Sequence, residues 1–290
     1  MPDTAAQAEI RGIDISKLVE GFADVDVILK KYVRVISTSS REIRWYSKTA
    51  GFLTSPTTTE VTTDMIETSS KSMPVVIEPS YTRHTSYVKK FFASSPLITL
   101  EDIKDSDPDV WGDMVRDSAR AVNKKIDAHI YTILVAAGAG TTAALVDGWN
   151  VPATADPISD LMNARQTIKA NGYATDDLII YMNQAEERYL ISWLIQTKGS
   201  SIPNFSSSLV GTGNLMQLLD MKVLVDSNCP TDSVTVFSPS KAVIYKEFMP
   251  LTSAIVNDEG IGKTVRVWAE GVAIRPNPGA VFVITDTINS

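Results

Sequence analysis

The chain has 290 residues, 44% of them hydrophobic and 21% charged, and a mean hydropathy of +0.01, which excludes a disordered or fibrous protein and predicts a sizeable core. Asp and Glu outnumber Lys and Arg by 34 to 27, so the net charge of −7 gives no positive field for phosphate backbones or anionic lipid. One cysteine and two histidines far apart in sequence exclude a disulfide scaffold and a structural zinc site.

The N-terminal region carries no targeting signal. Residues 1–17 lack the basic stretch and apolar core of a signal peptide, and no apolar run approaches the roughly 18 residues of a membrane span. We therefore expect a chain made in the cytosol, with no membrane segment.

The first third of the chain is predicted to form extensions. Apolar side chains at spacings of three and four indicate an amphipathic helix over residues 14–31, interrupted near Gly21. Three segments are predicted to be strands: residues 41–49, 73–77 and 81–92. The Thr/Ser-rich residues 54–72 predict a protruding loop, since they contain few large apolar side chains. A ribbon of two or three strands is marginally stable alone, so we expect this one to lie on other protein.

A long helix is the clearest predicted element. Thr99 caps a short helix over residues 100–104, and Asp107-Pro108 supply an N-cap and a proline at the first helical position. One apolar stripe follows, made of Met114, Val115, Ala119, Val122, Ile126, Ile130, Ile133, Leu134 and Ala137. Gly138 and Gly140 end the pattern, which predicts a rod of about 30 residues and roughly 45 Å. A rod of this length indicates an architectural spine.

The second half of the chain predicts an α/β lobe followed by strands. A Gly/Thr/Ala-rich loop covers residues 138–156, and Asp156 caps a helix that stops at Asn171-Gly172. Helices are predicted over residues 157–170 and 184–196, and strands over residues 177–182, 222–225, 234–237, 242–248, 264–270 and 280–284. The Ser/Gly-rich residues 198–213 predict a mobile loop.

Two glycine-containing motifs resemble nucleotide-binding sites, but each lacks part of the required pattern. Residues 260–264 end like a P-loop, but Asn257 occupies the place of the first glycine, and a strand follows instead of a helix. We interpret them as a tight β-turn. Residues 138–140 follow a helix, whereas a dinucleotide fingerprint follows a strand, so we interpret them as a helix stop.

No catalytic, cofactor-binding or metal-ligating residue is predicted, and no cofactor is expected. His84 lies in a polar strand, and we interpret it as solvated or as an interface residue. His129 lies on the long helix, and we interpret it as packing at an interface or edge. Carboxylates stabilise the positive end of a helix dipole, and this explains the acidic cluster better than a metal site does, because the glycine of a calcium loop is missing. The cluster consists of Glu101, Asp102, Asp105, Asp107 and Asp109. Cys229 has no neighbouring base and is interpreted as an inert thiol.

The order of elements resembles the Hong Kong 97-type major capsid protein of tailed bacteriophages and related archaeal viruses. The matching stretches are residues 81–92, 98–103, 113–127 and 265–275. The resemblance implies an α+β fold with an N-terminal arm, an extended β E-loop, a long spine helix in a P-domain and an α/β A-domain. The implied boundaries are 1–40 for the arm, 41–95 for the E-loop, 96–145 for the P-domain, 146–240 for the A-domain and 241–290 for closing strands shared by the A- and P-domains.

The resemblance implies an icosahedral shell of hexamers and pentamers around double-stranded DNA, without sequence-specific contacts to the DNA. It also implies a portal, a scaffold protein that is separate or already removed, and in some cases decoration proteins, with assembly in the host cytoplasm and residence in the virion. Lys71, Lys89 and Lys90 lie in or near the loop, and none is assigned to the covalent cross-link of certain members. The alternatives are an encapsulin-type nanocompartment, an unrecognised α/β enzyme and, least well fitted, a tail or fibre component.

Overall fold

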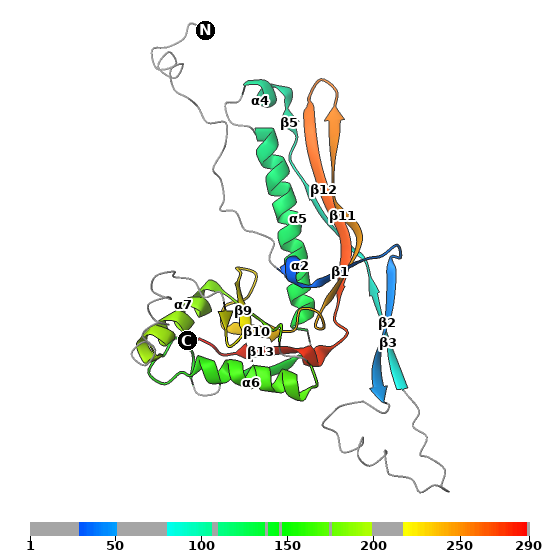
Figure 1. Ribbon diagram of the computed structural model, residues 1–290. Helices are drawn as coiled ribbons and strands as arrows, with labels where there is room; N and C mark the ends of the chain where they lie inside the picture. Colours follow the sequence, from blue (N-terminus) through cyan, green and yellow to red (C-terminus); the bar gives the residue numbers. More distant parts are fainter. Residues whose placement is uncertain are drawn as a thin grey trace, which may run out of the picture. The chain divides into compact units, whose positions relative to one another are not determined.

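The computed structural model describes residues 29–50, 80–105, 110–136, 139–144, 147–173, 176–198 and 217–288 (Figure 1). The chain divides into two compact units. Among the described residues, the first unit contains 90–125 and 249–270, and the second contains 29–89, 126–248 and 271–288. Four described elements contribute residues to both units: helix α5 (Val110–Leu134), strands β11 (Ile244–Asp258) and β12 (Gly262–Ile274), and strand β4 (Lys89–Ser94), whose first residue Lys89 belongs to the second unit.

The first unit is built on antiparallel β structure and the start of α5. It contains β4 (Lys89–Ser94), β5 (Ile98–Thr99) and helix α4 (Leu100–Asp105). β12 lies between β11 and β4 and also pairs with β5, where Gly262 is opposite Thr99. A Cβ atom on Gly262 would lie 2.2 Å from the carbonyl oxygen of Ile98, so only glycine allows the strands this close.

Helix α5 confirms the predicted spine, with different ends. It begins at Val110 and stops at Leu134, which gives 25 residues and a length of about 38 Å. Val122, Ile126, Ile130 and Leu134 are buried at intervals of four, as the apolar stripe predicts. The helix stops before Gly138 because the guanidinium of Arg275 donates to the carbonyl oxygens of Leu134 (3.1 Å) and Ala136 (2.7 Å).

The second unit contains a six-stranded mixed sheet. Its strand order is β6 (Gly140–Ala143), β13 (Val281–Thr285), β10 (Ser233–Phe237), β7 (Ile179–Met182), β9 (Met221–Val225) and β8 (Gln217–Leu218). β13 is parallel to β6 and β7 is parallel to β9, whereas β10 is antiparallel to both β13 and β7. A 3₁₀ turn, η2 (Pro278–Ala280), precedes β13.

Two helices complete the core of this unit. The Asp156 carboxylate caps α6 (Pro157–Ala170) by accepting from Ser159 N, as predicted, and α6 packs against β13 and β10. Asn183 caps α7 (Gln184–Trp193), which continues into a π-helical turn, η1 (Leu194–Lys198). The largest fully buried side chains of this core include Trp149, Leu161, Ile168, Leu178 and Ile180.

The second unit also holds the chain's N-terminal described elements. Helix α2 (Leu29–Tyr32) leads into β1 (Arg34–Ser37), which pairs in parallel with β11 from Arg34 opposite Ile244 to Ser37 opposite Glu247. Strands β2 (Glu42–Ala50) and β3 (Ser80–Tyr87) form a separate antiparallel hairpin.

Several predictions needed correction. The single strand over 81–92 is two strands, β3 and β4, and the strands over 242–248 and 264–270 are only parts of the longer β11 and β12. The loop over 138–156 contains β6, and β1, β5 and β8 were not predicted. Most of the helix over 14–31 and all of the loop over 54–72 lie outside the described residues, as do the strand over 73–77 and the Asp107-Pro108 cap. The predicted loop over 198–213 also lies outside them, apart from Lys198, which ends η1. No helix within the described residues is long and apolar enough to cross a membrane.

Candidate subunit-contact surfaces

The β2–β3 hairpin has an outer face rich in tyrosine and arginine. Residues directly opposite in an antiparallel pair share a face, and the register places Tyr46 opposite Arg83 and Glu42 opposite Tyr87. On this face Tyr46, Tyr81 and Tyr87 are 61%, 58% and 66% exposed. Tyrosine and arginine are enriched at protein interfaces, because they present a large rigid or planar area together with hydrogen-bonding groups. This outer face is therefore a candidate contact surface.

The inner face of the same hairpin lies toward other parts of the second unit. Ile43 on this face is only 8% exposed. The Trp45 indole stacks on the His84 imidazole, with ring centroids 4.2 Å apart and an interplanar angle of 19°. At the hairpin base, Val88 N donates to Arg41 O, and the Arg41 guanidinium lies 4.8 Å from the centre of the Phe248 ring. One face of the hairpin is thus fixed by its own chain, and the other faces outward.

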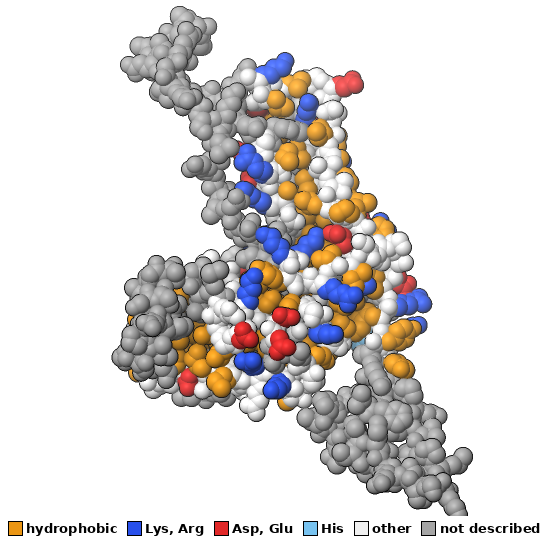
Figure 2. Space-filling view, in the orientation of Figure 1, with side chains coloured by type: hydrophobic (Ala, Val, Ile, Leu, Met, Phe, Trp, Pro, Cys, Tyr) orange, Lys and Arg blue, Asp and Glu red, His pale blue; other side chains and the backbone are white. Residues whose placement is uncertain are grey.

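The first unit exposes a second group of apolar side chains. Side chains alternate along β11, and Leu251 and Ile255 on its outward side are 40% and 57% exposed. Ile261 follows in the turn to β12 at 60% exposure. Phe92 is half exposed, and the Lys90 ammonium lies over both its ring (5.5 Å) and the Trp268 ring (5.4 Å). Figure 2 shows hydrophobic side chains gathered over these strands, which makes this surface a second candidate contact.

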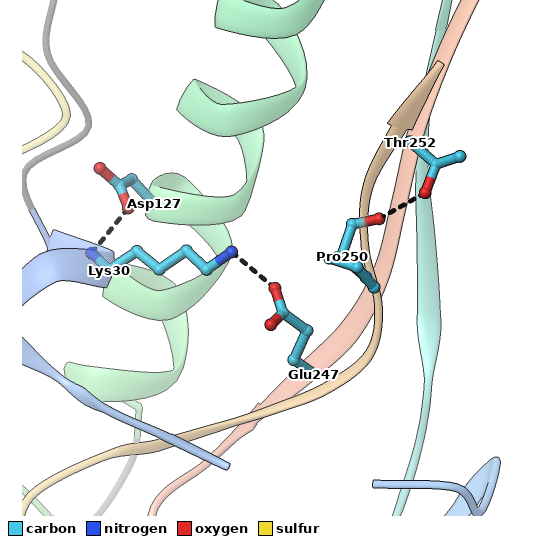
Figure 3. Close-up of polar contacts among 5 residues, drawn as sticks. All are labelled: Lys30, Asp127, Glu247, Pro250 and Thr252. Atoms are coloured by element: carbon cyan, nitrogen blue, oxygen red, sulfur yellow. Dashed lines mark hydrogen bonds and ion pairs between the residues drawn. The ribbon is translucent and has the colours of Figure 1, made fainter. Parts of the chain in front are cut away.

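A buried carboxylate fixes the start of α2 within the second unit. Asp127 of α5 is 1% exposed and accepts hydrogen bonds from the backbone N–H groups of Leu29 (3.2 Å) and Lys30 (2.9 Å). The Lys30 ammonium in turn donates to Glu247 Oε1 on β11 at 2.8 Å (Figure 3). The carboxylate satisfies N–H groups at the start of α2, which no intrahelical acceptor can reach. Lys30 is thereby bonded to residues that lie 97 and 217 positions further along the chain.

The two histidines do not meet. His84 is half-buried in its stack with Trp45. His129 is buried rather than at an edge, and its Nε2 accepts from the backbone N–H of Ala273 at 3.3 Å. Burial, together with the charge of Lys89, lowers the pKa of His129 to about 4. His129 is therefore a neutral structural acceptor.

Cys229 and the acidic residues have local roles. Burial raises the pKa of the Cys229 thiol to about 12. Thr99 Oγ1 accepts from Asp102 N at 3.1 Å, which confirms the predicted cap and places Glu101 and Asp102 in the first turn of α4. The side chain of Asp105 and the whole of Asp107 and Asp109 lie outside the described residues. Within the described part of the chain, no group of three or more His, Cys, Asp or Glu side chains is placed to hold a metal ion.

The P-loop-like motif is a turn, as predicted. Ile261 N donates to Asp258 O at 3.1 Å, and Gly260 has a φ of 79°, which glycine adopts without strain. Lys263 and Thr264 lie within β12. No helix N-terminus follows that would face a phosphate group.

Comparisons with known proteins agree with this architecture. A family model described as phage capsid protein matches residues 88–284. The capsid of a native GTA particle has a TM-score of 0.69 at 12% identity, with 98% of both chains covered. The capsid of cyanophage P-SCSP1u has a TM-score of 0.67 at 10% identity, with 95% of this chain and 94% of that chain covered. A virus-like particle from Pyrococcus furiosus has a TM-score of 0.58 at 15% identity, with 89% and 91% covered.

At these identities the structural likeness establishes the fold. It confirms the predicted α+β architecture of the Hong Kong 97 type. No curated protein sequence matches the chain significantly.

Proposed function

Because this chain belongs to the phage capsid protein family, we propose that it is the major capsid protein of a tailed-phage-type particle and assembles as hexamers and pentamers into an icosahedral shell around double-stranded DNA. The observation that carries the proposal is the family match over residues 88–284, which covers residues of both units. The proposed role is structural and non-enzymatic.

Two surfaces of the isolated chain support assembly with identical copies. The outer face of the β2–β3 hairpin presents Tyr46, Tyr81 and Tyr87, and the first unit presents Leu251 and Ile255. Large exposed apolar groups gain free energy when a partner removes them from water, at about 25 cal/mol for each Å² buried. Arginines beside the tyrosines add directional hydrogen bonds to acceptors on a partner.

We assign the five predicted segments to the parts of such a subunit. Residues 1–40 are the N-terminal arm, 41–95 the E-loop, 96–145 the P-domain, 146–240 the A-domain and 241–290 the closing strands. The proposed partners are identical subunits, a scaffold, a portal and in some particles decoration proteins, with DNA enclosed without sequence-specific contacts. The net charge of −7 suits a wall that does not hold its DNA tightly. Assembly is proposed to occur in the host cytoplasm, and the mature subunit to reside in the virion capsid.

Assembly of the purified full-length protein tests the proposal. We expect sedimentation and electron microscopy to show capsomers or closed shells, and particles from the natural source to protect double-stranded DNA from nuclease. A protein that stays monomeric under all assembly conditions would refute the proposal. An encapsulin-type compartment, which the phage capsid match does not favour, would instead enclose a protein cargo and no genome.

Variants locate the contact on the hairpin. The double substitution Tyr46→Ala and Tyr87→Ala is expected to raise the concentration needed for assembly by about tenfold or more, since interface aromatics often contribute at least 1 to 2 kcal/mol each. Met162→Ala is the matched control, because Met162 on α6 is similarly exposed (55%) and belongs to neither candidate surface. Equal assembly by both variants would exclude the hairpin face as a contact.

A further inference from the structure

A pocket of about 400 Å³ lies within the second unit, beside the inner face of the β2–β3 hairpin. Trp45, His84 and Ser86 form its hairpin wall, and Ile133 from α5 and Arg275 after β12 form part of the opposite wall. This volume falls in the range of pockets that bind ligands or peptide side chains. The proposed capsid function, taken alone, does not explain why the hairpin leaves this space beside it.

One hydrogen-bond donor in the pocket wall has no acceptor. Trp45 Nε1 is buried and has no partner among the described residues. Other tryptophans with described side chains do have partners: Trp149 donates to Asp160 Oδ2 (2.8 Å), Trp193 to Ala155 O (2.7 Å) and Trp268 to Met249 Sδ (3.1 Å). Buried polar groups in native proteins are nearly always paired, so an orphaned indole N–H beside a pocket indicates that something is missing from the isolated chain.

We infer that, in the assembled shell, an apolar segment of a second copy of this chain enters the pocket and places an acceptor oxygen on the Trp45 indole N–H. The inference rests on the proposed function, because identical subunits are what a capsid protein contacts. The outer face of the same hairpin is already a candidate contact surface, so the pocket extends that surface to the inner side.

The hairpin is able to admit such a segment. Among the described strands it pairs only with itself, and it is held to the second unit near its base by the Arg41–Phe248 contact. An incoming segment at its inner face therefore breaks no backbone hydrogen bond between the hairpin and another described strand. The stack of Trp45 on His84 is then a preformed apolar wall for the incoming segment.

Trp45→Phe tests the inference, because it removes the N–H and keeps a ring that can stack on His84. In the unassembled subunit we expect an unchanged or higher melting temperature, since an unpaired buried donor is lost. In the shell we expect the opposite sign: a melting temperature for dissociation lower by about 2 to 4 °C, or a critical assembly concentration higher by about fivefold. The indole hydrogen-bond band in the difference Raman spectrum of wild type minus Trp45→Phe should also move toward the bonded position on assembly.

Trp149→Phe is the matched control. Its N–H bonds to Asp160 within the chain, so we expect the substitution to lower the melting temperature of subunit and shell alike. Shells of Trp45→Phe that dissociate like wild-type shells, or an indole band that does not move, would overturn the inference and leave the capsid function standing. If the wild-type chain forms no shell under any condition, the proposed function fails first and the inference fails with it.

Discussion

Protonation of His129 is expected to destabilise the subunit in mild acid. His129 lies on α5 and is 9% exposed, and its Nε2 accepts the backbone N–H of Ala273 on β12. An imidazolium has no free lone pair, so the protonated residue cannot accept this bond. It would also place a positive charge in a buried site near Lys89.

The size of the effect follows from the pKa of His129 in the two states. Burial, and secondly Lys89, lower the pKa to about 4 in the folded chain, against an ordinary value of 6.5. A depressed folded pKa means that the unfolded chain takes up the proton first. The contribution of neutral His129 to the free energy of unfolding is therefore fully present above pH 6.5. It is lost as the pH falls toward 4, by about 3 kcal/mol at most.

The assay compares wild type with His129→Gln by urea unfolding of the unassembled subunit between pH 7.5 and 4.5. Glutamine does not titrate, and its side-chain oxygen can still accept from Ala273 N. We expect the wild-type free energy of unfolding to fall more steeply with acid, the difference in slope approaching about 1.4 kcal/mol per pH unit, which is one proton. Carboxylates titrate in both proteins and cancel in the comparison.

Two results bear directly on this reasoning. Parallel pH curves for wild type and His129→Gln would show that His129 does not titrate with folding and would refute it. Lys89→Met is the second variant, because removing the exposed ammonium removes the smaller of the two causes. We expect the pKa of His129 to rise slightly and the acid slope to become shallower. No change in the slope on removing Lys89 would leave burial as the sole cause.

Three further substitutions test other parts of the structure. Burial raises the pKa of Glu186, so its charged form costs stability as the pH rises. Glu186→Gln should therefore raise the free energy of unfolding at pH 8, with the gain fading by pH 4, and a gain that does not change with pH would contradict this cause. Gly262→Ala should lower the free energy of unfolding by about 2 kcal/mol or more, because its Cβ meets the Ile98 carbonyl. Gly260→Ala, with open space around it and a φ of 79°, should lower it by about 1 kcal/mol. Equal melting temperatures for the two variants would exclude the clash at Gly262. Cys229 should react with iodoacetamide at pH 8 at least about 100-fold faster in urea than in the folded chain, and equal rates would show that its burial is transient.

The spine helix and the capped helix α6 were predictable because their signals are local. The stripe of residues four apart on α5 and the Asp156 cap both act within a few residues of one another. Short strands are different. β6 was assigned to a Gly-rich loop, since the two threonines of its sequence GTTA are too short a signal between Gly and Ala, and it is a strand because β13 pairs with it. Gly140 fits there because a Cβ would lie 2.7 Å from the Phe282 ring, a contact 142 positions away in sequence.

The candidate surfaces were only partly predictable. Alternation in β2 and β3 assigns Tyr46 and Tyr87 to one face, but it does not say which of the two faces the rest of the second unit covers. The Lys30–Asp127–Glu247 cluster has no local signal, because it joins positions from three separate elements. A period-2 pattern of tyrosines across both strands is the signal that groups these side chains on one face.

The distribution of polar groups in the described residues separates what holds the subunit together from what is left for neighbours. Asp127 fixes the start of α2, Asp226 accepts from the Tyr181 hydroxyl at 2.6 Å, and Glu186 accepts from Asp232 N at 2.6 Å. Each of these buried carboxylates fixes a chain segment within its own unit, as a structural role requires. The tyrosines of the hairpin, the aliphatic side chains of β11 and the indole N–H of Trp45 have no such internal use. Folding gives each carboxylate of the first group at least one hydrogen bond within its own unit, whereas the second group is where association with other copies gains its free energy.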